Sequence, residues 1–214
     1  MFFVDNFNKK NTITCMSQNS TNRFKHKIIG ISGNARSGKD TLGRNMVSIL
    51  SDSGIKAKTF SFAHELKKSV DGFLIEQLGI SAFTEDSDEK KIIRPFLVNW
   101  GTEIMRKKDS EHWIKSIEKK LSDNCVNIIT DVRFENELDW VKEKNGLSVF
   151  LSREGIAPAN SYEEENNKLL SENVDLKFFI GNFEDEKLIM LTSNEILDRL
   201  INNDIFELWK ATCH

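Results

Sequence analysis

The sequence predicts an α/β fold of three layers, in which helices cover both faces of a mainly parallel β-sheet. Two observations support this prediction. Short apolar runs of strand type alternate along the chain with segments whose apolar residues recur every three or four positions, as on one face of a helix. The first apolar run also stops at a glycine-containing loop that leads into a helical segment, which suits a strand buried in a parallel sheet.

Five segments fit strands. The first, Ile-Ile-Gly-Ile at 28–31, is a short apolar run, and the second alternates between apolar and polar residues. The third is rich in β-branched residues and ends at Asp131. The expected strands are residues 28–31, 56–62, 126–130, 147–151 and 174–180.

Helices are expected between these strands. After the glycine-containing loop, Leu42, Met46, Ile49 and Leu50 share one helix face, and Gly54 can end that helix. The same spacing marks further helices, which are expected around residues 66–74, 113–121, 134–141 and 196–201.

Three segments have a less regular pattern. Residues 84–91 are highly charged and have no apolar stripe, so we expect a mobile surface segment there. Pro95 can open the next helix, because proline is tolerated in a first helical turn. Residues 161–187 hold eight acidic and three basic residues, which is typical of a solvated acidic face.

The length of 214 residues predicts one domain with additions, at about 150 residues per domain. The domain is expected over residues 27–202. Residues 1–26 are polar and lack a sustained period, so they are interpreted as a poorly ordered N-terminal extension, and residues 203–214 as a C-terminal tail.

Charge and cysteine content limit the partners. The net charge of −3 argues against a protein dominated by a basic nucleic-acid surface, and no run of about 18 apolar residues predicts a membrane span. Cys15, Cys125 and Cys213 are too few and too far apart for a disulfide framework or a metal site. We therefore expect a cytoplasmic protein that acts without nucleic acid or membrane.

The strongest motif follows the first expected strand and has the P-loop spacing, glycine, four residues, then Gly-Lys. Glycines let several backbone N–H groups converge on phosphate oxygens, and the following helix N-terminus adds partial positive charge. Lys39 can reach the β- and γ-phosphates of a bound nucleotide. The residues expected to hold ATP are Gly33, Asn34, Ala35, Arg36, Ser37, Gly38, Lys39, Asp40 and Thr41. The alternative is a glycine-rich turn that binds nothing.

Asp40 departs from the usual P-loop, in which a Ser or Thr after the lysine contacts Mg²⁺. A carboxylate can bind Mg²⁺ directly or through water, and Thr41 follows one position later. Asp131, at the end of an apolar strand, has the place of a second acidic magnesium ligand. The candidate metal ligands are therefore Asp40, Thr41 and Asp131.

Asp131 and Arg133 both lie at the end of the third expected strand, where α/β sheets bind ligands. An arginine fork suits a phosphate. The alternative role for Asp131 is to cap the helix that follows it.

The segment from Arg94 to Arg106 contains further candidates. Phe96 and Trp100 have helical spacing and can simply be core residues. Gly101 costs about 1 kcal/mol inside a helix, so close approach of another group would explain it. Arg94 and Arg106 can contact phosphate or form surface ion pairs.

Weaker candidates lie near the end of the chain. Arg153 leads into an expected loop that could close over the transferring phosphate. Ser171 and Glu172 lie between an expected helix and the fifth strand, where alone they would be interpreted as a cap. The four histidines have no metal-ligand spacing.

Taken together and in order, these motifs resemble the deoxynucleoside monophosphate kinases of bacteriophages and their bacterial relatives. The resemblance covers about residues 27–200 and rests on four segments, namely Gly-Lys-Asp-Thr at 38–41, Trp-Gly-Thr-Glu at 100–103 with Arg106 and Trp113, Asp-Val-Arg-Phe-Glu-Asn-Glu at 131–137, and Ser-Glu at 171–172. It implies a P-loop kinase fold with a mobile lid. It also implies Mg²⁺-dependent transfer of the ATP γ-phosphate to a deoxynucleoside monophosphate, for DNA precursor synthesis.

The resemblance also implies roles for individual residues. Lys39, Asp131, Arg133 and Arg153 would be catalytic. The residues expected to bind the acceptor are Arg94, Trp100, Glu103, Arg106, Ser171 and Glu172. Animal-type phosphomevalonate kinases share the Gly-Lys-Asp feature and a strand-end Asp-x-Arg, so a small-molecule kinase of that kind is the alternative, as is a nucleotide-binding protein without turnover. The accepted base and the oligomeric state, a homodimer included, stay open.

Overall fold

The computed structural model describes residues 28–158, 160–181 and 192–198. The predictions for residues 1–26 and 203–214, and for the last part of the expected helix at 196–201, lie outside the described residues. No helix in the described part of the chain is long and apolar enough to cross a membrane.

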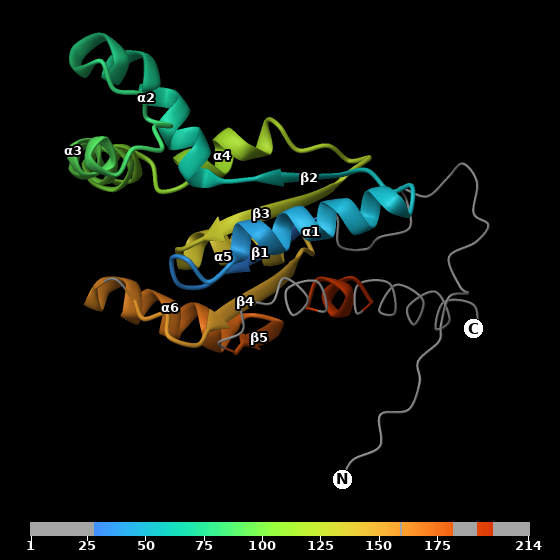
Figure 1. Ribbon diagram of the computed structural model, residues 1–214. Helices are drawn as coiled ribbons and strands as arrows, with labels where there is room; N and C mark the ends of the chain where they lie inside the picture. The colour runs from blue at the N-terminus through green and yellow to red at the C-terminus, as the bar shows by residue number, and fades with distance from the viewer. Residues whose placement is uncertain (1–27, 159, 182–191, 199–214) are drawn as a thin grey trace, which may run out of the picture.

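A parallel sheet forms the centre of the described structure (Figure 1). Its strands have the order β2-β3-β1-β4-β5 within the described residues, and every neighbouring pair is parallel. The strands are β1 (Ile28–Ser32), β2 (Ala57–Phe60), β3 (Val126–Val132), β4 (Leu147–Arg153) and β5 (Leu176–Ile180). All five expected strands are therefore present.

Helices cover both faces of this sheet. They are α1 (Lys39–Asp52), α2 (Phe62–Leu78), α3 (Ser87–Val98), the π-helix η2 (Asn99–Arg106), α4 (His112–Glu118), α5 (Glu135–Glu143) and α6 (Ser161–Asn173), with a further helical segment at 192–198. One apolar cluster joins the sheet to α1 and to residues 196 and 197, and another joins it to α2, α4, α5 and α6. The predicted three-layer α/β fold is confirmed.

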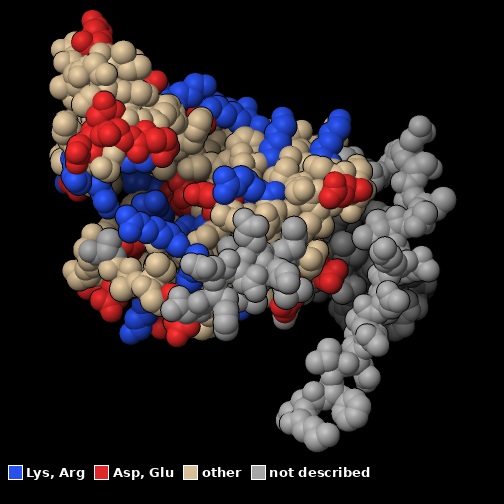
Figure 2. Space-filling view, in the orientation of Figure 1, with Lys and Arg blue, Asp and Glu red and all other residues tan. Residues whose placement is uncertain are grey.

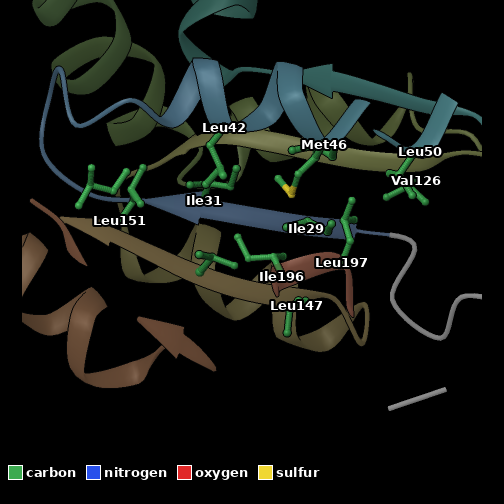
Figure 3. Packing of buried hydrophobic residues seen from close by; sticks show 13 residues of the cluster. Ile29, Ile31, Leu42, Met46, Leu50, Val126, Leu147, Leu151, Ile196 and Leu197 are labelled. Atoms are coloured by element: carbon green, nitrogen blue, oxygen red, sulfur yellow. The ribbon is translucent and has the colours of Figure 1, made fainter. Parts of the chain in front are cut away.

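Strand β1 lies at the centre of the sheet, and its buried side chains fix its position. Ile29 and Ile31 are completely buried on the face that α1 covers, where Leu42, Met46 and Leu50 of α1 meet them (Figure 3). Each buried aliphatic side chain of this size contributes about 1.5–3 kcal/mol relative to exposure. Burial of β1 on both faces holds its carboxyl end, and the loop that follows, in a fixed position.

The expectation of a mobile surface segment at 84–91 is wrong from Ser87 onward, because α3 begins there. The Asp86 side chain accepts the backbone N–H groups of Asp88 and Glu89, both at 2.9 Å, and so caps the helix. An aspartate followed three residues later by glutamate is a helix-start signal, which outweighs the absent apolar stripe. Pro95 consequently lies inside α3 and does not open a helix.

Other corrections concern element ends. Arg153 is the last residue of β4, so it belongs to the sheet and not to a following loop. Ser171 and Glu172 lie in the last turn of α6. The helix expected around residues 66–74 is part of α2, in which Phe73 is 54% exposed.

Candidate active site

The phosphate loop, residues 33–38, lies between β1 and α1, at the sheet edge where the carboxyl ends of the parallel strands meet (Figure 1). Gly33 has φ +135°, and a Cβ there would lie 2.0 Å from the backbone oxygen of Leu151. Gly38 also has a positive φ, +98°. Only glycine fits at residue 33, so the predicted need for glycines in this loop agrees with its geometry.

Ser37 is the one residue of the described chain whose buried side-chain polar atom has no hydrogen-bond partner. Its hydroxyl is completely buried inside the loop. An unsatisfied buried donor costs about 1–3 kcal/mol. A phosphate oxygen held in the loop would satisfy this donor, so the residues present fit a phosphate group.

Lys39 places a cation in the same loop. Its Nζ donates to the backbone oxygens of Gly33, at 2.8 Å, and Asn34, at 2.5 Å. The pKa of Lys39 is lowered to about 8, mainly by burial and also by the positive charge of Arg133, whereas the carboxylates of Asp40 and Asp131 act in the opposite direction. The lysine is therefore protonated at neutral pH and close to the other three charged groups, which the fold has brought together.

Asp40 and Asp131 are held in different ways. The Thr130 hydroxyl donates to Asp40 at 2.8 Å. Asp131 accepts three hydrogen bonds of 2.8 Å, from the Ser61 hydroxyl and from the backbone N–H groups of Phe62 and Ala63. Asp131 therefore binds the start of α2, and the alternative that it caps the helix that follows it is wrong.

These carboxylates could hold Mg²⁺ only with help from a ligand. The described residues contain no group of three or more His, Cys, Asp or Glu arranged to hold a metal ion. Mg²⁺ at nucleotide sites is commonly bound by one or two carboxylates together with phosphate oxygens. Asp40 fits that arrangement, whereas the Thr41 hydroxyl already accepts a hydrogen bond from Arg44 at 3.3 Å.

Glu137 is a residue that the sequence reasoning did not single out. It is 1% exposed, accepts the backbone N–H groups of Arg133 and Phe134, and forms an ion pair with Arg106. Burial raises its pKa to about 7, although Arg106 acts in the opposite direction. An acidic residue in the first turn after Phe134 is the signal that could have identified it.

Arg94 and Glu103 line an open hollow of about 550 Å³ on α3 and η2, together with Lys91, Pro95, Val98 and Asn99. The space-filling view shows a depression between the parts of the molecule formed by α2–α3 and by α6, with Lys and Arg atoms gathered along it (Figure 2).

Trp100 does not line that hollow. Its Nε1 donates to the Ser69 hydroxyl at 3.1 Å, and its ring stacks on Phe96, 6.4 Å between centroids. Both rings are half-buried and pack against an apolar cluster of α2 and α3, and the role of Trp100 in binding the acceptor stays a prediction. Gly101 confirms the predicted close approach, because a Cβ there would lie 2.1 Å from Leu66 Cδ1.

The remaining candidates are not brought to the phosphate loop by any contact that the described residues show. Arg106 is bound to Glu137, and Ser171 donates to the backbone oxygen of Lys168 in its own helix. Glu172 is exposed at the end of α6. Their roles in binding the acceptor stay predictions.

Helix α6 contacts the loop through residues that were not candidates. The Ala35 N–H donates to a carboxylate oxygen of Glu163 at 3.2 Å. Asn167 Nδ2 donates to Asn34 Oδ1, and Asn34 Nδ2 donates to the backbone oxygen of Ile156 at 3.1 Å. A carboxylate thus uses one N–H of the phosphate loop.

Comparison with known proteins gives consistent matches. The family model described as Phosphomevalonate kinase matches residues 31–146. A protein of Acanthamoeba polyphaga mimivirus named "Putative deoxynucleotide monophosphate kinase" is 29% identical over 160 residues, which are 64% of this chain and 80% of that protein.

Among solved structures, a gluconokinase from Sinorhizobium meliloti 1021 is 16% identical with a TM-score of 0.45, over 86% of this chain and 98% of that chain. A shikimate kinase from Acinetobacter baumannii is 12% identical with a TM-score of 0.42, over 83% and 94%.

Proposed function

The chain belongs to the phosphomevalonate kinase family, and from this premise we propose that it transfers the γ-phosphate of ATP to a deoxynucleoside monophosphate in the presence of Mg²⁺. That it is a kinase of the P-loop type, as the sequence predicts, is confirmed by the family match. The matched residues contain the whole phosphate loop, α3, η2 and the pair Asp131 and Arg133. The proposal includes a cytoplasmic site of action.

The observation that carries the proposal is the meeting of Lys39, Asp40, Asp131 and Arg133 at one edge of the sheet. Phosphoryl transfer depends mainly on positioning and on neutralising charge, and needs little covalent chemistry from the protein. In the proposal, Lys39 and Arg133 neutralise phosphate charge beside the loop, and Asp40 and Asp131 supply carboxylates there.

Each group has a distinct role in the proposal. The loop N–H groups and Ser37 bind the ATP phosphates, and Lys39 neutralises charge on the β- and γ-phosphates. Arg133, whose side chain is exposed, meets the acceptor phosphate. Asp40 and Asp131 would hold Mg²⁺, which when bound neutralises further phosphate charge. Arg153 and Arg94 would add cations at the rim.

A deoxynucleotide acceptor is supported by the mimivirus relative's name and by the aromatic residues of the lobe formed by α2, α3 and η2. Phe73 stacks on Phe96, with centroids 5.7 Å apart, and Phe96 stacks on Trp100. Phe73 is 54% exposed, which leaves ring surface on which a nucleobase could stack. Phosphomevalonate has no ring to use this surface.

Phosphomevalonate is the second candidate acceptor, because the family model carries that description. Both candidate acceptors present a phosphate group to Arg133 and to the hollow that Arg94 lines. The proposed donor side of the reaction is the same for both.

The test is a panel assay on the full chain. ADP formation is followed with ATP and Mg²⁺ and, one at a time, each ribonucleoside and deoxynucleoside monophosphate and phosphomevalonate. The Lys39→Ala variant, prepared in parallel, controls for contaminating kinases. We expect ADP and a nucleoside diphosphate to form in equal amounts with at least one deoxynucleoside monophosphate.

Two results would overturn the proposal. Transfer to phosphomevalonate alone would establish the second candidate. Binding of ATP without transfer to any acceptor would indicate a nucleotide-binding protein without turnover.

A further inference from the structure

We propose that Glu137 is a positioning residue. Its buried carboxylate fixes Arg133 at the edge of the sheet where the carboxyl ends of the strands meet. Through Arg106 it also joins Arg133 to the lobe formed by α2, α3 and η2, called the acceptor lobe below. The inference rests on the proposed function in one respect, namely that Arg133 meets the transferring or accepting phosphate. Glu137 lies within the matched residues and ends the motif at 131–137, but neither assigns it a role.

One carboxylate oxygen of Glu137 binds the backbone just beyond the end of β3. That strand ends at Val132, so the N–H of Arg133 lies beyond it. Glu137 Oε2 accepts this N–H at 2.8 Å and the Phe134 N–H at 3.1 Å. The backbone from which the Arg133 side chain projects is therefore fixed by one carboxylate oxygen.

The other carboxylate oxygen of Glu137 binds the acceptor lobe. Glu137 Oε1 forms an ion pair with Nη2 of Arg106, the last residue of η2. The same guanidinium lies 3.7 Å from the centroid of the Phe134 ring and donates to Asn136 Oδ1 at 3.3 Å. Helix η2 also carries Glu103 of the hollow, so one carboxylate joins the lobe to the strand end.

Stability alone does not explain why Arg106 and Glu137 form a buried ion pair. The side chains of Arg106 and Glu137 are 12% and 1% exposed. A buried ion pair is often no more stabilising than apolar residues of similar size, because both charges lose water. Capping of α5 would explain the bond to the Phe134 N–H, but it does not require a buried arginine from another lobe.

A positioning role accounts both for the bonds of Glu137 to the backbone after β3 and for its ion pair with Arg106. Arg133 itself is exposed and has no side-chain contact that would fix it among those the structure gives for the described residues. A catalytic group displaced by 1 Å can lose about 100-fold in rate. Holding the backbone of Arg133 therefore matters for catalysis, whereas the ATP-binding loop is built from other residues.

The variant Glu137→Gln tests this role because it keeps the shape and removes the charge. We expect kcat to fall about 100-fold, with the Kd for ATP unchanged. Glu135→Gln is the matched control, since Glu135 is exposed in the first turn of the same helix and should leave kcat unchanged.

A double-mutant cycle separates positioning from general destabilisation. If Glu137 acts through Arg133, then Glu137→Gln should cost less than about threefold in the Arg133→Ala background, because coupled residues are not additive. Equal losses in both backgrounds would overturn the proposal, as would a matching loss of ATP affinity in Glu137→Gln. The cycle uses whichever acceptor the wild type phosphorylates.

Crystal structures of the wild type and of Glu137→Gln provide a readout that does not depend on activity. We expect the Arg133 backbone to move in the variant while residues 33–41 stay in place. An unmoved Arg133 would overturn the positioning role. If the wild type phosphorylates no acceptor, the proposed function fails, and the crystal structures alone decide the role of Glu137.

Discussion

The phosphate loop and the acceptor lobe differ in how far other protein groups bind their polar side chains. In the loop, the Ser37 hydroxyl is buried without a partner, and Lys39 is held only by two backbone oxygens. In the lobe, Trp100 is bound to Ser69 and Arg106 to Glu137. Under the proposed function, a ligand would complete the loop, whereas much of the lobe is completed by its own side chains. Direct contact with the acceptor would then fall to exposed groups such as Arg94.

The largest expected effect tests the loop. Lys39→Ala should lower kcat/KM at least about 100-fold, because a cation placed against transferring phosphate contributes several kcal/mol to transition-state stabilisation. Steady-state kinetics in the presence of excess Mg²⁺ measures this. Lys58→Ala, at an exposed position on β2, is the control and should be neutral. Wild-type activity in Lys39→Ala would contradict the role of the loop.

The second prediction compares the two carboxylates at the sheet edge. Asp131→Asn replaces one of the two acceptor oxygens by an N–H₂ group that faces one or two of the three donors, and should cost about 2–3 kcal/mol of folding free energy. That corresponds to a fall in Tm of roughly 5–10 °C for a chain of this size. Asp40→Asn loses a single hydroxyl partner and should change Tm by less than about 2 °C.

Calorimetry and Mg²⁺ titration of activity together distinguish the two carboxylates. Asp40→Asn should raise the Mg²⁺ concentration needed for half-maximal activity about tenfold, the loss of about 1.4 kcal/mol expected for one ligand. A large fall in Tm for Asp40→Asn, with none for Asp131→Asn, would reverse the assignment.

The two regions also differ in how far their sequence predicts them. The place of the phosphate loop between β1 and α1 and its need for glycine were predicted, because both depend on consecutive residues. The five strands follow from local apolar runs. Gly101 was interpreted correctly because an unfavourable residue in a helix implies a neighbour.

Contacts between distant segments were not predicted. Asp131 binds the start of α2, about 70 residues earlier, and not the helix beside it. Arg106 forms an ion pair with Glu137, and Trp100 donates to Ser69 of α2. Helical spacing says which residues share a face but not what that face meets. The start of α3 and Glu137 were missed despite local signals, the cap at Asp86 and the acidic first turn of α5.

The third prediction uses two glycines of the acceptor lobe. Gly101→Ala forces a methyl group against Leu66 and should destabilise the protein by about 1–3 kcal/mol. Gly72→Ala, in α2 with nothing within 4 Å of the added atom, should instead stabilise by up to about 1 kcal/mol. Urea unfolding of both variants measures the difference.

A second substitution tests whether contact with Leu66 causes the loss of stability in Gly101→Ala. Leu66→Ala should recover part of the stability in the Gly101→Ala background, because it removes the clashing atoms. If Gly101→Ala proves as stable as Gly72→Ala, the lobe is less tightly packed than its internal contacts indicate, and the contrast with the loop weakens.

The smallest expected effect concerns a backbone N–H group of the loop that a side chain of α6 already binds. Glu163 accepts the Ala35 N–H in an exposed contact, and phosphate must compete with it for that donor. Exposed charge contacts contribute up to about 1 kcal/mol, so Glu163→Gln should lower the Kd for ATP about two- to fivefold. Glu164→Gln, next to it and exposed, is the control and should leave the Kd unchanged.

The pH dependence of this gain provides a check on its cause. Glu163 also raises the pKa of Lys39, which lies at about 8. Without Glu163 that pKa falls further, so less of the lysine is protonated as pH rises through this range. The gain in ATP affinity should therefore be fullest near pH 7 and shrink above pH 8 in equilibrium titrations. Weaker ATP binding by Glu163→Gln at pH 7 would mean that α6 supports the nucleotide site and does not compete for it, and the loop would then resemble the lobe in relying on its own side chains.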